Sequence, residues 1–175
     1  MINEIIKRNG ITYGVITGIT LSLITTLMYI VNLELFIAWW TTFLSFSIFI
    51  IVPVIMLIKT KADLKNNFPF KDAFTAYFIT AMIGLFISVA FKMVLFNVID
   101  PSIKTSLLDL TINYLKSTSD KFGVPAASLN EMIDNLRKTD PFSIVEQLKG
   151  SVVNLFFCAI LGVIMAAIFK SKTTS

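Results

Sequence analysis

Four long apolar segments constrain this 175-residue chain more than any other feature. They cover residues 11–31, 36–58, 73–99 and 151–169, and together they hold a single charged side chain, Lys92. Each is about as long as the roughly 20 helical residues that cross the hydrocarbon core of a bilayer. A helix of a soluble protein keeps a charged face toward water, and these segments have none. We therefore predict an all-α membrane protein built as a bundle of four transmembrane helices.

The overall composition agrees with this class. Hydrophobic residues make up 55% of the chain and charged residues 15%, and the mean hydropathy is +0.80. Charged residues normally form about a quarter of a soluble domain. The length suits one compact unit, so we expect residues 1–175 to be a single integral membrane domain. The segment 11–31 is longer than the apolar core of a signal peptide, and we expect it to be an uncleaved first helix.

Residue types that usually carry chemistry are scarce. The chain has no histidine and one cysteine, which excludes an internal disulfide and a thiolate zinc cluster. No aspartate or glutamate lies in the apolar segments, so a proton relay through the membrane lacks its carboxylates. We therefore predict no catalytic residue, no metal and no cofactor, and a protein that is not an enzyme. The basic residues form no nucleic-acid-binding pattern, and no nucleic acid is expected as a partner.

The basic residues are divided unevenly between the connections. If the segments cross alternately, one side receives residues 1–10, 59–72 and 170–175, with eight lysines and arginines against three acids. The other side receives residues 32–35 and 100–150, with six basic residues against eight acids. Short loops rich in lysine and arginine stay in the cytoplasm. We therefore predict a multi-pass protein with both termini cytoplasmic and the long insertion outside.

Small residues recur at every fourth position along the apolar segments. In the predicted first helix they are Gly10, directly before the apolar segment, then Gly14, Gly18 and Ser22, and this spacing places them on one helical face. Such a face lets a second helix approach closely. Similar stripes in the third and fourth segments complete the predicted helix-packing residues: Gly84, Ser88, Cys158, Gly162 and Ala166. The neighbouring helix could belong to the same chain, which we favour, or to a second copy.

Lys92 is the one residue of these segments that is costly to bury. A charge at the centre of a membrane helix costs about 2.5–3.5 kcal/mol on insertion scales. Lys92 lies seven residues before Ile99, about 10 Å from the helix end, so its stem could reach the headgroups. It also continues a small-residue stripe, which directs it toward the bundle. There we predict a polar cluster of Lys92 with Glu34, Asn154 and Tyr29, which serves either a structural or snorkelling role or a role in binding a ligand or in coupling.

The insertion at residues 100–150 carries the signals of an extracytoplasmic helical hairpin. Asp100-Pro101 and Asp140-Pro141 each pair an N-cap carboxylate with proline at a first helical position. Ser128-x-x-Glu131 has the pattern of a capping box. The apolar residues of the first hairpin helix recur at helical spacing: Ile103, Leu107, Leu110 and Tyr114. The apolar face could lie on the bundle, on the lipid surface or on a partner.

Two stretches of the chain resemble a known family. Phe68-Pro69-Phe70-Lys71-Asp72-Ala73-Phe74 opens the third segment and Asp100-Pro101 closes it. With the glycine-rich first helix, they resemble the small four-helix membrane proteins of Bacteroidetes-type bacteria that form domain of unknown function 4199. The resemblance covers nearly the whole chain. It implies an inner-membrane location and the same four-helix layout, but no activity, ligand or catalytic residue.

Two functions are open at this point. The first is a non-enzymatic structural or accessory subunit that assembles, through the glycine seam and the hairpin, with a second copy or another membrane protein. The alternative is a small transporter, channel or lipid-carrier accessory, for example to a lipid-linked-sugar glycosyltransferase. In that case Lys92 would bind an anionic headgroup.

Overall fold

The computed structural model describes residues 2–171 of the chain. Within that range the α-helices are α1 (Glu4–Val31), α2 (Trp39–Asp63), α3 (Phe70–Val94), α4 (Ile103–Phe122), α5 (Ala126–Thr139) and α6 (Ile144–Phe169). Two short helical segments, η1 (Leu33–Phe36) and η2 (Leu95–Ile99), follow α1 and α3. The helices α1, α2, α3 with η2, and α6 are long and apolar enough to cross a membrane. The predicted all-α bundle of four transmembrane helices is confirmed.

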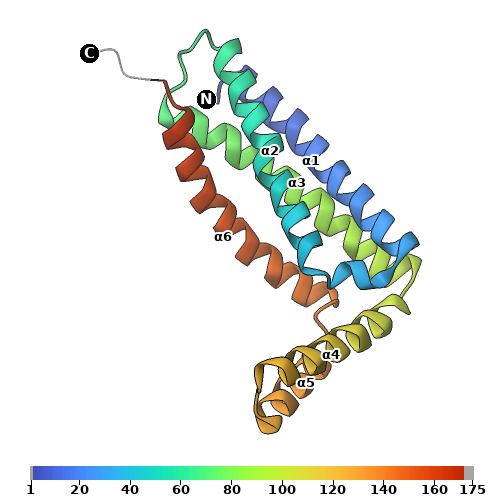
Figure 1. Ribbon diagram of the computed structural model, residues 1–175. Coiled ribbons are helices and arrows are strands. Elements are labelled where there is room, and N and C mark those ends of the chain that lie inside the picture. The colour runs from blue at the N-terminus through green and yellow to red at the C-terminus, as the bar shows by residue number, and fades with distance from the viewer. Residues whose placement is uncertain (1, 172–175) are drawn as a thin grey trace.

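Helix α3 holds the bundle together. It packs along α1 on one side and along α6 on the other (Figure 1). Helix α2 packs less extensively on α1 and α3, and it makes little contact with α6. The start of α1, the α2–α3 loop and the end of α6 lie at one end of the bundle. The hairpin of α4 and α5 lies at the other, which we call the hairpin end. The chain therefore crosses the bundle four times in alternating directions.

The surface of the four spanning helices is apolar, and their interior is partly polar. Leu27 is 60% exposed and Phe86 76% exposed, whereas the hydroxyl-bearing Thr17, Thr60 and Thr80 are fully buried. Leaving apolar surface in water costs about 25 cal/mol per Å², so an exterior of this kind is stable only in lipid. Inside, the hydroxyls of Thr17 and Thr80 donate to the carbonyls one turn earlier at 2.8 and 3.0 Å, and that of Thr60 donates to the Met56 sulfur at 3.3 Å. This distribution is that of a membrane bundle.

A small apolar cluster fixes the base of the hairpin to the bundle. Its buried members are Leu95 and Phe96 from η2 and Ile103 and Leu107 from α4. The Phe96 ring meets the Phe36 ring of η1 and the Phe142 ring ahead of α6 edge to face, each at a centroid distance of 5.8 Å. Lys104 adds polar links to Asn97 at 3.1 Å and to Asp140 at 4.0 Å. The first turns of α4 are therefore held at the end of the bundle.

The helix starts in the insertion differ from those predicted. Helix α4 begins at Ile103, because the Asp100 carboxylate accepts hydrogen bonds from Ser102 and closes a turn before the helix. The capping box predicted at Ser128 is wrong, since α5 already begins at Ala126, directly after Pro125. A serine does cap the start of α6, but it is Ser143. The hydroxyl of Ser143 accepts a hydrogen bond from the backbone N–H of Glu146 at 3.3 Å, so the cap lies after the predicted Asp140-Pro141 start.

Candidate functional site at the hairpin end of the bundle

The glycine stripe of α1 lies against α3 of the same chain. A Cβ atom added to Gly10 would come within 2.9 Å of Ile79. One added to Gly14 would come within 2.8 Å of Ile83, and one added to Gly18 within 2.5 Å of Ile87. Contacts this short do not occur between real side chains. The two backbones approach closely only because these residues are glycine. The stripe is filled within the chain and leaves no open face for a second copy.

The other residues predicted to pack helices lie on both sides of α3. Gly84 on α3 faces Thr17 of α1, where an added Cβ would be 2.8 Å away, and Gly162 on α6 faces Tyr77 at 2.9 Å. The remaining predicted positions are buried or half-buried in the same bundle: Ser22, Ser88, Cys158 and Ala166. The predicted residues therefore lie in a bundle in which α3 packs between α1 and α6.

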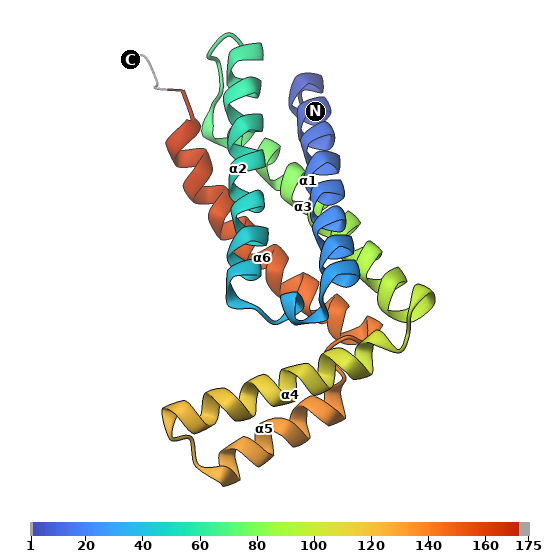
Figure 2. The same cartoon turned by 45° about the vertical axis from the view of Figure 1, so that its right-hand side comes forward.

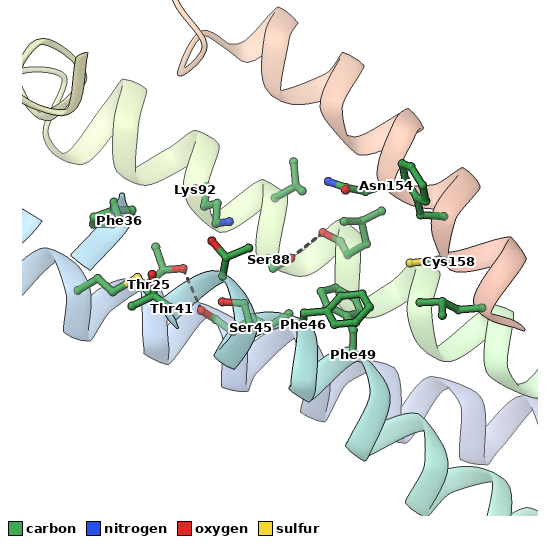
Figure 3. Close-up of a pocket in the computed structure, with 17 residues that line it drawn as sticks. Thr25, Phe36, Thr41, Ser45, Phe46, Phe49, Ser88, Lys92, Asn154 and Cys158 are labelled. Atoms are coloured by element: carbon green, nitrogen blue, oxygen red, sulfur yellow. Dashed lines mark hydrogen bonds between the residues drawn. The ribbon is translucent and has the colours of Figure 1, made fainter. Parts of the chain in front are cut away.

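A cavity of about 360 Å³ lies between α1, α2, α3 and α6, in the half of the bundle nearest the hairpin (Figure 3). One part of its wall is polar and carries a single charge, from Lys92. The polar side chains of that part come from all four helices: Thr25, Thr41, Thr42, Ser45, Ser88, Lys92 and Asn154. The rest of the wall is apolar and includes four phenylalanine rings: Leu21, Met28, Phe36, Phe46, Phe49, Leu85, Val89, Phe157, Cys158 and Leu161. The cavity is amphipathic.

Lys92 is half-buried, and its ammonium group points into this cavity (Figure 3). Among residues 2–171, no carboxylate forms a salt bridge with it and no side chain or carbonyl accepts a hydrogen bond from it. Two nearby hydroxyls donate to backbone carbonyls instead, Ser88 to Leu85 at 3.0 Å and Thr25 to Leu21 at 2.9 Å. Their oxygen atoms remain beside the cavity, but the ammonium charge itself has no countercharge in the described chain.

The structure divides the predicted polar cluster. Lys92 and Asn154 line the same cavity, as expected from their depth. Tyr29 instead donates a hydrogen bond from its hydroxyl to the Asp100 carboxylate at 3.1 Å, outside the cavity. Glu34 is exposed on η1, because this short helix crosses the end of the bundle and turns the carboxylate outward. The predicted contact between Lys92 and Glu34 is therefore absent from the described residues.

Asp100 marks the junction between the membrane bundle and the hairpin. Hydrogen bonds from the Ser102 side chain and from Tyr29 favour the ionised carboxyl and lower its pKa below the ordinary value. The carboxylate thereby ties α1 to the turn that begins the hairpin. It lies beyond the spanning helices and takes no part in the cavity.

Sequence reasoning missed most of the polar wall of the cavity. Thr41 and Ser45 lie one turn apart on α2 and line the same cavity as Ser88 and Lys92 of α3. Their spacing of four residues indicates a shared polar face of the helix. This signal is weak, because serine and threonine in membrane helices commonly bond to their own backbone. The Thr41 hydroxyl does so, lying 2.6 Å from the carbonyl oxygen of Ala38, at the start of α2, and at the same distance from that of Leu35.

The fold and the cavity together define a multi-pass α-helical membrane protein with an amphipathic internal site. A family model described as "Protein of unknown function (DUF4199)" matches residues 12–171, and the chain belongs to this family. The family inferred from the sequence motifs is thereby confirmed. No curated protein and no solved structure matches the chain. The description of the family assigns no activity, so function has to be argued from the site.

Proposed function

We propose that this protein is a non-enzymatic accessory protein of the membrane that binds an amphiphile with an anionic headgroup. The headgroup would lie in the cavity beside Lys92, with Asn154 and Ser45 as hydrogen-bond donors. The observation that carries the proposal is the position of Lys92. Its ammonium group faces an amphipathic cavity and has no countercharge among residues 2–171.

The energetics favour an anion at this position. A lysine inside a membrane helix costs about 2.5–3.5 kcal/mol on insertion scales, and it persists where something offsets that cost. An anionic group within about 4 Å of the ammonium would gain roughly 4 kcal/mol at an effective dielectric constant of about 20. Its own desolvation opposes this gain. We therefore expect the interaction of the Lys92 ammonium with an anionic headgroup to raise the affinity for the lipid about tenfold or more, and tenfold corresponds to about 1.4 kcal/mol.

The shape of the site suits a lipid that enters from the side. All four spanning helices line the cavity, and since α6 packs on α3 and makes little contact with α2, we expect the cavity to open between α2 and α6. The lining residues Phe46 on α2 and Phe157 on α6 are both exposed, on the apolar surface of the bundle. A headgroup beside Lys92 would leave its acyl chains between these aromatic rings and the surrounding bilayer. The volume of about 360 Å³ is at the small end of the range for ligand sites, which fits a headgroup better than a whole lipid.

The proposed setting is the inner membrane of a bacterium, with both termini in the cytoplasm. The excess of lysine and arginine at the end of the bundle opposite the hairpin supports this orientation. The cavity would then lie in the outer leaflet. Because the glycine seam is filled by α3, a partner protein would have to bind to another surface of the bundle.

The test compares lipid binding by the wild type and by Lys92→Met in a mild detergent. Native mass spectrometry would measure the binding of phosphatidylglycerol, which is anionic, and of phosphatidylcholine, which is zwitterionic. We expect the wild type to prefer phosphatidylglycerol and the variant to lose affinity about tenfold or more. Lys116→Met, at an exposed position of the hairpin, is the matched control and should bind like the wild type. Equal binding of phosphatidylglycerol by the folded Lys92→Met variant would refute the proposal.

A further inference from the structure

One face of α4 begins in contact with the bundle and continues beyond it. Ile103, Leu107, Leu110 and Tyr114 recur at intervals of three or four residues, so they share one face of the helix. The first two are buried in the cluster at the base of the hairpin. Leu110 is half-buried and Tyr114 is 46% exposed. The face that rests on the end of the bundle therefore continues to Tyr114, where nearly half of the side chain is exposed.

The direction of the hairpin decides what this face meets. In both views α4 and α5 run across the long axis of the bundle, and in Figure 2 the hairpin extends sideways below the ends of the spanning helices. Helix α4 starts at Ile103, only four residues after the last residue of the third membrane span, Ile99. The hairpin thus begins at the level where the membrane ends. The face of α4 that contacts the bundle through Ile103 and Leu107 continues to Tyr114, and there it is directed toward the lipid leaflet around the bundle.

The remaining surface of the hairpin is that of an interfacial element. A separate stripe of α4 is polar and exposed, and it consists of Asp109, Asn113, Lys116 and Asp120. On α5 the exposed side chains include the charged Asp134 and Arg137 and one large apolar residue, Met132, which is 46% exposed. At the tip, Phe122 is 80% exposed. Helices with one apolar and one charged face lie in the plane of the membrane surface, where tyrosine is enriched.

We infer that the α4–α5 hairpin lies on the bilayer surface, and that its partner is the lipid leaflet on the hairpin side. Tyr114 would sit at the headgroup level, beyond the part of α4 that covers the bundle. The stripe that contains Asn113 and Lys116 would face water. This surface is separate from the Lys92 cavity, so either assignment can fail without the other.

Spin labels can measure which face of the hairpin meets lipid. In a Cys158→Ser background reconstituted into lipid nanodiscs, nitroxides would be attached at Tyr114→Cys and, as the matched control one residue away, at Asn113→Cys. Oxygen concentrates in lipid and a nickel chelate stays in water. We expect severalfold higher accessibility to oxygen than to the chelate at position 114, and the reverse at position 113. Labels at Met132→Cys and Asp134→Cys repeat the comparison on α5.

Two results would overturn the inference. Equal, high accessibility to the chelate at positions 113 and 114 would show a hairpin that stands in water. A label at 114 that is immobilised and shielded from both reagents would show that protein covers the face. If Cys158→Ser does not fold, the same labels can be placed with Cys158 retained, because its thiol is buried in the bundle.

Discussion

Replacing Gly18 by alanine should separate α1 from α3. The added Cβ would lie 2.5 Å from Ile87 Cβ and 2.8 Å from Ile87 Cγ2. The nearer atom is attached to the backbone of α3 and cannot rotate away, so the helices themselves must move apart. Overpacking of this kind costs about 1–3 kcal/mol, and the rigid contact places Gly18→Ala near the upper limit. Alanine regains about 1 kcal/mol through its higher helix propensity. The expected net destabilisation is about 2 kcal/mol.

Gly150 provides the matched control, because it is also a helical glycine but has open space around it. An added Cβ at Gly150 meets nothing within 4 Å, so only the helix propensity changes. Gly150→Ala should therefore be neutral or stabilising by up to about 1 kcal/mol. The effect of alanine should also follow the contact distances in α1, with Gly18 affected most and Gly10, where the nearest atom is 2.9 Å away, affected least.

The assay is equilibrium unfolding in mixed micelles, followed by far-ultraviolet circular dichroism. A loss of about 2 kcal/mol corresponds to roughly a thirtyfold change in the unfolding equilibrium constant. Ile87→Ala should rescue Gly18→Ala only in part, since it removes Cγ2 but leaves the Cβ that makes the closest contact. If Gly18→Ala and Gly150→Ala have the same stability, the close approach of α1 and α3 is wrong.

Two further predictions concern the ends of helices. Hydrogen bonds lower the pKa of the Asp100 carboxyl, so its ionised form contributes stability above the ordinary carboxyl pKa of about 3.9 and loses it as the pH falls through the lowered value. The melting temperature should fall more steeply on acidification for the wild type than for Asp100→Asn, and parallel curves would contradict this. Ser143→Ala should cost about 0.5–2 kcal/mol and speed hydrogen exchange in the first turn of α6. Ser128→Ala, inside α5, should be nearly neutral, and equal effects of the two would contradict the cap assignment.

The membrane spans and the close helix packing could be predicted because both are periodic in the sequence. Apolar length fixes the spans, although α1 and α6 begin seven residues before the predicted segments, at Glu4 and Ile144. These extensions carry polar residues, so apolar length alone did not include them. The glycine stripe predicts a close neighbour from spacing alone. Its identification as α3 needs the tertiary structure, since another helix with small residues would give the same pattern.

The polar site could be predicted only in part. Depth along the helices placed Lys92 and Asn154 together, as they are in the cavity. It could not place Glu34 or Tyr29, because their positions depend on the path of η1 and on the turn at Asp100. Sequence periodicity describes each helix separately, and it does not report how two helix ends meet. The sparse contact between α2 and α6 could not be predicted from the sequence for the same reason.

The most direct test of the lipid site is photo-crosslinking in bilayers. A phosphatidylglycerol analogue with a diazirine near its headgroup would be incorporated into nanodiscs with the protein, and the labelled peptides would be mapped by mass spectrometry. The proposal predicts labelling concentrated around Thr42 and Asn154, at the opening between α2 and α6, and a strong reduction in the Lys92→Met variant. Labelling spread evenly over the lipid-facing surface, and unchanged by Lys92→Met, would contradict it.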